Sequence, residues 1–191
     1  MLHLAAEFLR KELNGWLVQR TGSSDPFGTA VLSRIASDTG KWDIPTDRIG
    51  VALVNVEEER TVRSQLPQAA LVDGRQVMRE PEVKLNLHFL FAAHFNNYEQ
   101  ALKQLSFVLT FFQGHPVFTP ERHPALDPRI RKLGVDLITL SFEQLNQLWA
   151  FVGAKQLPAA LYRARLVALQ DDEPGAVGTP ITKVGASVEV L

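Results

Sequence analysis

The sequence predicts an α/β (α+β) fold in which a mixed, mostly antiparallel sheet is covered by helices and followed by a C-terminal arm. Two observations lead to this fold class. Apolar residues recur every three or four positions in three segments and at alternate positions in others. The elements follow in the order α-β-β-β-α-β-α-β, with no internal repeat. With 191 residues, 46% of them hydrophobic, the chain fits a single domain, which we place at residues 1–169, with residues 170–191 as a linker and arm.

The first part of the chain combines a helix with two strands. In residues 2–20, apolar residues such as Leu9 and Leu13 lie at helical spacing among charged residues, which predicts an amphipathic helix. The β-branched runs at 31–36 and 49–56 then predict two strands with a long connection between them.

A polar loop precedes the clearest strand of the chain. Residues 61–82 are typical of a surface loop, with a small hairpin around Asp73-Gly74. In Val83–Phe95 every second residue is apolar, so one face of this strand is expected to be buried. The other face changes from polar residues, starting at Lys84, to apolar residues, starting at Leu90. We expect this second face to be partly exposed to water at its start and covered further on.

Two capped helices are predicted in the second half. Asn97–Gln113 and Ser141–Val152 each begin with a residue that caps helices and has a glutamine three positions later. Gly114 and Gly153 stand where a left-handed residue would end each helix. The residues expected on the apolar stripes are Ala101, Leu102, Leu105, Val108, Leu109 and Phe112 in the first helix, and Phe142, Leu145, Leu148, Trp149 and Val152 in the second.

The remaining segments are two strands and three connections. Four prolines make His115–Arg129 an extended and stiff loop. Residues 133–140 and 160–169 predict strands. Asp171–Pro180 is an acidic linker rich in proline and glycine, and Ile181–Leu191 is a short β-prone arm.

Composition excludes several classes of protein. The formal charge of −1 provides no general attraction to nucleic acid or to an anionic membrane. The absence of cysteine excludes disulfides, thiolate metal sites and cysteine catalysis, and it suits a reducing cytoplasm. Charged residues interrupt the N-terminal MLHLAAEFLRKEL, so it lacks the apolar core of a signal peptide. No window approaches the roughly 18 apolar residues of a membrane span.

No motif for catalysis or cofactor binding is found. The nucleophile elbow, the P-loop, the dinucleotide fingerprint and the H-E-x-x-H zinc motif are all absent. His88 and His94 lie on one strand face roughly 20 Å apart, too far to bind one metal ion from a straight strand. His115 and His123 lack the spacing of a zinc site, and Ser141 is better explained as a cap. We therefore expect no enzyme, no catalytic residue, no cofactor and no metal.

Basic residues provide the first candidate interface. Arg129, Arg131 and Lys132 form a small cluster, and Arg163 and Arg165 lie on one face of a strand. They are not interleaved with exposed aromatic residues, as a nucleic-acid stacking platform would be. Two interpretations remain, namely solvated or salt-bridged strand edges, and a protein–protein interface.

The arm provides the second candidate interface. An extended segment of this kind adds to a free sheet edge, and its interface residues would be Ile181, Val184, Val188 and Val190. The loops 61–82 and 115–129 are open to two interpretations, as contact elements or as plain surface connections.

An ordered set of short motifs lies in residues 83–169. The motifs are Leu85–Phe91, Tyr98–Leu102, Leu105-Ser106, Phe111–Phe118, Gln144–Trp149, Gly153–Lys155 and Leu157–Arg165. In this combination the sequence resembles the small tail-cap, or tail-terminator, proteins of phage-tail-like extracellular contractile injection systems of the antifeeding-prophage and virulence-cassette type. The N-terminal helix also fits the family pattern, whereas residues 21–82 match it only in general layout.

The resemblance implies a structural protein without catalytic residues. It implies a ring of six subunits that ends polymerisation of the inner tube and anchors the sheath. The implied partners are copies of the chain and the tube and sheath proteins, with no nucleic acid and no membrane. Assembly would take place in the cytoplasm, and the phage-tail-like particle would be released or stay inside the cell. No further attachment segment is expected after the arm.

The alternative is a function of another class. A monomeric α/β domain of this size could bind a small ligand or nucleic acid. A wide pocket lined by Asp136, Arg163 and His88 would favour that alternative.

Overall fold

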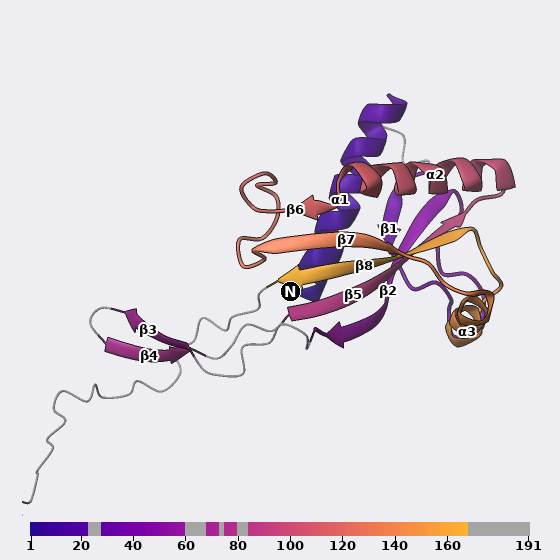
Figure 1. The fold of residues 1–191 in the computed structure, drawn as a ribbon. Coiled ribbons are helices and arrows are strands. Elements are labelled where there is room, and N and C mark those ends of the chain that lie inside the picture. Colours follow the sequence, from indigo (N-terminus) through magenta and orange to yellow (C-terminus); the bar gives the residue numbers. More distant parts are fainter. Residues whose placement is uncertain (23–27, 60–67, 73–74, 80–83, 168–191) are drawn as a thin grey trace, which may run out of the picture.

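The computed structural model describes residues 1–22, 28–59, 68–72, 75–79 and 84–167. The observed α+β architecture confirms the predicted fold class (Figure 1). The elements are α1 (Leu2–Thr21), β1 (Ala30–Leu32), β2 (Arg48–Glu58), β3 (Gln68–Val72), β4 (Arg75–Arg79), β5 (Lys84–His94), α2 (Tyr98–Gly114), β6 (Val117–Phe118), β7 (Lys132–Ile138), α3 (Phe142–Val152) and β8 (Ala159–Val167).

Six strands form one twisted sheet in the order β1-β2-β5-β8-β7-β6 (Figure 1). β1 and β2 are parallel, and the other neighbouring pairs are antiparallel, as expected for a mostly antiparallel sheet. β3 and β4 form a separate two-stranded sheet in which Val72 pairs with Arg75. This pairing agrees with the predicted hairpin, and its turn residues Asp73-Gly74 lie outside the described residues.

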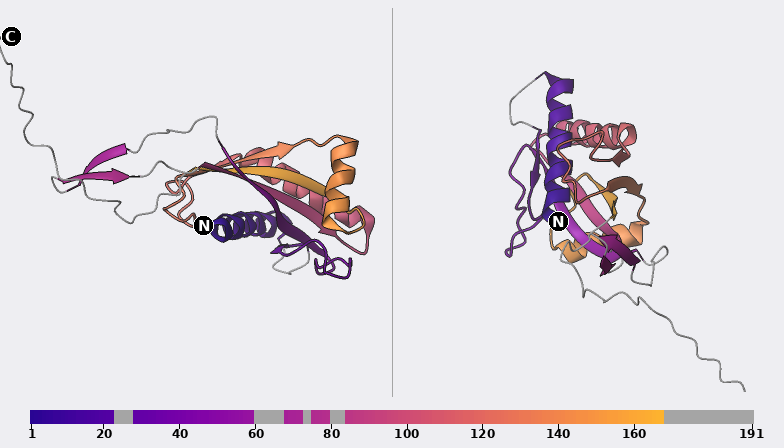
Figure 2. Two further views of the ribbon diagram at one scale, coloured as in Figure 1. Left: turned by 90° about the horizontal axis from the view of Figure 1, so that it is seen from below. Right: turned by 90° about the vertical axis from the view of Figure 1, so that its left-hand side faces the viewer.

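Helices α1 and α2 cover one face of the six-stranded sheet (Figure 2). Leu9 and Leu13 of α1 belong to the same buried cluster as Phe89 and Phe91 of β5. The rings of Phe91 and Phe112 meet edge to face, with centroids 5.2 Å apart. Such aromatic pairs stabilise a core by about 0.5–1.5 kcal/mol beyond the area they bury. The alternation predicted for β5 thus places its apolar face against the two helices.

Helix α3 covers only half of the opposite face. Leu90 and Ala92 pack there with Trp149 of α3 in a second, smaller core. The other half carries the polar residues at the start of β5, so the predicted change along this face is confirmed. Its polar start is more closed than expected, because Asn86 is only 7% exposed.

The helix caps follow the sequence signals with one exception. The Asn97 side chain accepts from backbone N–H groups of the first turn of α2, and Ser141 and Gln144 form a complete capping box on α3. Gly153 ends α3 in the left-handed conformation, as predicted. The prediction for Gly114 was wrong. This residue is the last of α2, and the cap position falls on His115, whose φ of −130° needs no glycine.

Strand β1 is shorter than the predicted strand 31–36. It ends at Leu32, and the N–H of Ser33 donates the last bond to the carbonyl of Val51. The chain then folds over the α3 side of the sheet, where Ile35 and Ile44 are buried. Packing of Ile35 into that second core takes precedence over its β propensity.

The two-residue strand β6 lies inside the loop 115–129, which was predicted to be extended without a strand. Val117 and Phe118 pair with Gly134 and Leu133 at the outer edge of the sheet. The prolines of this loop flank the pair, so both residues retain the N–H groups that a ladder requires.

Candidate functional site

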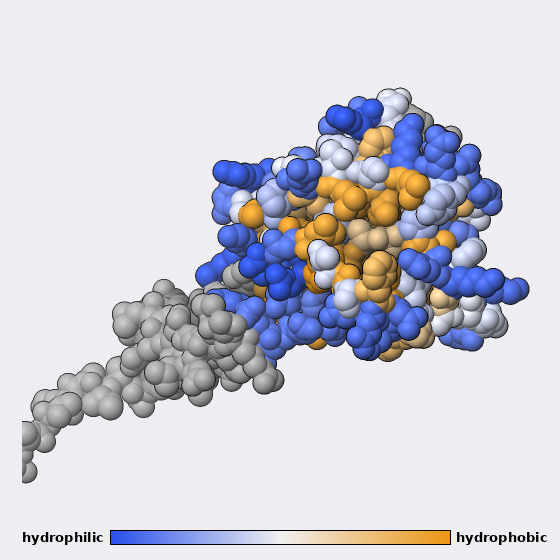
Figure 3. Space-filling view, turned by 45° about the vertical axis from the view of Figure 1, so that its right-hand side comes forward, coloured by the Kyte–Doolittle hydropathy of each residue, from blue (hydrophilic) through white to orange (hydrophobic). Residues whose placement is uncertain are grey.

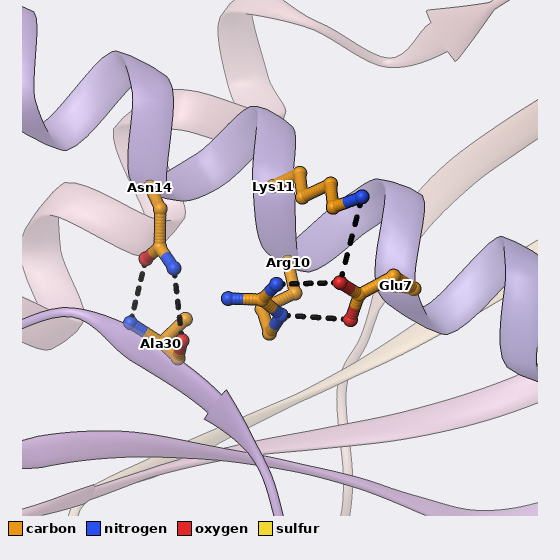
Figure 4. Close-up of polar contacts among 5 residues, drawn as sticks. All are labelled: Glu7, Arg10, Lys11, Asn14 and Ala30. Atoms are coloured by element: carbon orange, nitrogen blue, oxygen red, sulfur yellow. Dashed lines mark hydrogen bonds and ion pairs between the residues drawn. The ribbon is translucent and has the colours of Figure 1, made fainter. Parts of the chain in front are cut away.

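Three stretches of the sheet have one side that is not paired with another strand, and the three differ in how that side is covered. The first stretch is β1. The side-chain amide of Asn14 on α1 bonds to both backbone groups of Ala30 (Figure 4). The N–H of Ala30 donates to Oδ1 over 2.7 Å, and Nδ2 donates to the carbonyl of Ala30 over 2.9 Å. One side chain thus replaces a neighbouring strand and closes this edge to further pairing.

The second stretch is the part of β2 that extends past β1. The register between β2 and β5 shifts between Leu53 and Asn55, which marks a β-bulge. Beyond it, Glu57 and Glu58 are exposed. A bulge and charged side chains are the usual means by which an edge strand resists pairing with another chain.

The third stretch is the end of β7. β6 pairs only with Leu133 and Gly134, and the last bond from this side runs from the N–H of Val135 to the carbonyl of Pro116 over 2.8 Å. Because ladder groups alternate in direction, the N–H and C=O of Leu137 face the same outer edge as those of Val135. Within the described residues, no strand pairs with this edge beyond Gly134. We call Val135–Ile138 the β7 edge.

An apolar groove of about 310 Å³ lies beside the β7 edge, between α2 and α3. Leucines of both helices line it, including Leu105, Leu109 and Leu148, together with Leu137 of the edge itself. We call this hollow the α2–α3 groove. Figure 3 shows apolar side chains gathered in one patch on the side of the molecule turned forward in that view.

The α2–α3 groove accounts for part of the exposed apolar surface of α2 and α3. Leu102, Leu109 and Phe142 were expected on stripes facing the core, but they are 44%, 38% and 94% exposed. Of these three residues Leu109 lines the groove, whereas Leu102 and Phe142 are not among its lining residues. An exposed apolar flank of this kind commonly marks a contact surface.

A polar half-face covers the rest of the α3 side of the sheet. Asp136 of β7 lies 2.6 Å from Arg165 and 3.8 Å from Arg163 of β8, so the two arginines share one carboxylate. His88 of β5 lies 3.9 Å from Glu57 of β2 on the same face. The predicted placement of both arginines on one strand face is therefore correct, and both remain about half exposed.

A second hollow could hold a small ligand, but it does not combine the residues named for the ligand-binding alternative. It measures about 400 Å³ and lies between α3 and the strands β2, β5 and β8. His88 and Glu57 line it with apolar residues such as Leu148 and Phe151, but Asp136 and Arg163 are not among its lining residues. The constellation that would favour small-ligand binding is thus not assembled in the described part of the chain.

The basic cluster lies where the loop after β6 enters β7. Arg129 binds the Asp127 carboxylate through Nε over 2.9 Å and Nη2 over 2.8 Å. Hydrogen bonds from the Arg129 side chain and backbone lower the pKa of the Asp127 carboxyl to about 2. Arg131 and Lys132 are exposed. The arm residues Ile181, Val184, Val188 and Val190 lie outside the described residues.

Three of the histidines make contacts that fit structural roles. The Nδ1 atom of His94 is 2.7 Å from the carbonyl of Ile44, and its ring lies 4.7 Å from that of Trp42. His115 stacks on Phe111, and His123 packs against a core phenylalanine. Among the described residues, no group of three or more His, Asp or Glu side chains could hold a metal ion. In the same part of the chain, no helix is both long and apolar enough to cross a membrane.

Sequence reasoning missed two of these features. Asn14 carries no local signal of its role, because that role depends on a residue 16 positions away. The α2–α3 groove is built from residues of α2, α3 and the strands β5, β7 and β8, so its only sequence signal is the excess width of the α2 stripe.

Two solved structures share this fold. The PVC sheath/tube terminator of an extracellular contractile injection system, in its extended state, matches with a TM-score of 0.60 and 17% identity over 94% of this chain. The anti-feeding prophage tube-terminating cap matches with a TM-score of 0.52 and 15% identity over 82% of this chain. The matches span 63% and 56% of those two proteins, less than two thirds of either.

Sequence comparison places the chain in a family. No curated protein sequence matches it. The profile of the Pvc16 N-terminal domain matches residues 5–183, which include most of α1 and all of the six-stranded sheet. Because this match spans nearly the whole sequence, the chain belongs to the Pvc16 N-terminal domain family.

Proposed function

We propose that this chain is a structural subunit of the cap that closes the inner tube and sheath of a phage-tail-like contractile injection particle. The observation that carries the proposal is the fold. The two solved structures that share it over 94% and 82% of the chain are a sheath/tube terminator and a tube-terminating cap. In this role the chain stops tube growth and ties the sheath to the tube end.

The proposal includes a ring of subunits, six in number, that works through contacts and without catalysis. Two features of the described residues support it. The sheet keeps one apolar edge open beside a groove, which suits contacts between subunits. Apart from buried Tyr162, the ionisable groups whose pKa is shifted are half-buried or exposed and take part in hydrogen bonds or ion pairs. None of these groups lines the α2–α3 groove or the hollow between α3 and the strands.

The polar half-face is the proposed contact for tube or sheath protein. Arg163 and Arg165 present two partly exposed guanidinium groups there, and Lys132 lies on the neighbouring strand. Arginine is enriched in protein interfaces, and its planar guanidinium group can bind one carboxylate through two parallel hydrogen bonds. Arg129 and Arg131 of the adjacent loop would extend this contact. Assembly is proposed to take place in the cytoplasm, without nucleic acid or membrane.

Electron microscopy of particles tests this function. Particles from cells that lack the chain are expected to have tubes of unregulated length or sheaths detached at one end. Re-expression of the wild-type chain, or of the surface variant Asn146→Ala as a matched control, should restore uniform particles. Particles of normal length that contract properly without the chain would contradict the proposal.

A further inference from the structure

The β7 edge and the α2–α3 groove together form a receptor for an extended apolar strand. Leu137 offers its backbone groups outward and is 54% exposed. The groove beside it is lined by apolar residues apart from Thr139. A strand added to β7 would gain main-chain hydrogen bonds at the edge and place alternate side chains in the groove.

We propose that the occupant is the arm, residues 181–191, of a second copy of this chain. This inference rests on the proposed function, because it describes how neighbouring cap subunits are joined. Apolar residues occupy every second position of the arm, at Val184, Ala186, Val188 and Val190. An extended strand with this pattern presents one continuous apolar face, as the groove requires.

The linker is long enough to reach the far end of β7 on its own subunit. The last described residue, Val167, pairs with Lys132, five residues along β7 from Leu137. That separation corresponds to about 17 Å, whereas residues 168–180 span up to about 43 Å when extended. The near part of β7, at Leu133 and Gly134, is paired with β6, so an arm that docked on its own subunit would have to pass around this strand. Docking on a neighbour avoids that detour.

The other outer strand of a second copy is a poorer occupant. β2 also has an unpaired stretch with exposed apolar residues, Leu53 and Val56. Its bulge interrupts the regular ladder, and Glu57 and Glu58 would approach the apolar groove. Bringing these carboxylates into an apolar site is costly. The arm has a single acidic residue, Glu189, on the face opposite its valines.

An arm that enters its neighbour's groove makes a head-to-tail contact. Two different surfaces meet in such a contact, and repetition generates a ring when the rotation closes. Each subunit then donates one arm and receives one, so every β7 edge in a closed ring is covered.

Thiol cross-linking in assembled particles tests the proposal. The chain has no cysteine, so introduced thiols are unique. Particles are purified from cells that co-express Leu137→Cys and Val188→Cys chains, and a short bis-maleimide is added. Cross-linking between copies should give a band at twice 21.3 kDa. Co-expression of Val56→Cys with Val188→Cys is the matched control, because Val56 is an exposed apolar residue on the unpaired part of β2, and it should give monomers.

The remaining outcomes separate the inference from the function on which it rests. A band at twice the mass from Leu137→Cys with Val56→Cys would show edge-to-edge pairing and overturn the arm proposal. An intramolecular product alone from the double variant Leu137→Cys/Val188→Cys would overturn it in favour of docking on the same subunit. Cap present in particles without any cross-link overturns the inference alone, and cap absent from particles overturns both. If Leu137→Cys does not fold, Leu109→Cys, also in the groove, replaces it.

Discussion

The two sides of the six-stranded sheet end in different ways. At β1, the amide of Asn14 occupies both backbone groups of Ala30, and helix α1 lies alongside. At β7, the strand β6 covers two residues and then stops, which leaves Leu137 beside an apolar groove. The first side is closed by a specific polar contact, and the second is prepared for one more strand.

This difference indicates which side of the subunit takes part in assembly. Open sheet edges invite unwanted pairing, so proteins close those that serve no purpose. Here the β1 side is closed by Asn14 and the free part of β2 by a bulge and carboxylates. Only the β7 edge combines, within the described residues, an unpaired strand with apolar surroundings.

The largest expected effect comes from removing the anchor of β6. Phe118 is fully buried and meets the ring of Phe8 edge to face at 5.3 Å. Phe118→Ala should lower the free energy of unfolding by about 3–5 kcal/mol, since a large cavity is left in the core. Urea denaturation measures this change. Val117→Ala is the matched control on the same strand, because Val117 is 40% exposed, and it should cost less than about 1 kcal/mol. Equal losses in the two variants would contradict the role assigned to Phe118.

The next effect concerns the closed side. Asn14→Ala removes both bonds to Ala30 and leaves a backbone N–H and C=O without these partners. We expect the free energy of unfolding to fall by about 1–3 kcal/mol, the usual cost of a buried polar group that loses its partner. Asn146→Ala, an exposed site on α3, is the control and should stay within about 0.5 kcal/mol. An Asn14→Ala chain as stable as the control would show that this edge needs no such closure.

The smallest effect is a pH dependence of stability that comes from the loop between β6 and β7. Arg129 lowers the pKa of Asp127 from its ordinary 3.8 to about 2 in the folded chain. The folded state therefore favours the charged carboxylate, so this contribution is present above about pH 4 and is lost as the pH falls toward 2. Asp127→Asn should reduce the drop in the urea midpoint between pH 5 and pH 2.5. Arg129→Gln should do the same, and an unchanged drop in both variants would contradict this assignment.

The sequence predicts the periodic parts of this fold well. The alternation in β5 and the caps at Asn97 and Ser141 are local signals, and the structure agrees with them. Local signals also misled in two places. Ile35 has β propensity but packs into the second core. Gly114 was expected to end its helix in a left-handed conformation, but it is the last residue of the helix, and His115 takes the cap position.

The interaction surfaces were less accessible to sequence reasoning. The bond between Asn14 and Ala30 and the α2–α3 groove depend on how distant segments meet, which no periodicity encodes. Arg163 and Arg165 were correctly placed on one face because strand alternation fixes it. Their shared partner, Asp136, lies on another strand and became apparent only from the pairing of β7 with β8.

Hydrogen exchange of the free chain and of the cap in assembled particles compares the two sides most directly. In the free chain the amide of Leu137 should exchange rapidly, whereas the amide of Ala30, bonded to Asn14, should be protected. In particles the Leu137 amide should become protected by at least about tenfold, which corresponds to about 1.4 kcal/mol, and the Ala30 amide should not change. Leu137 exchange as rapid in particles as in the free chain would contradict assembly through the β7 edge.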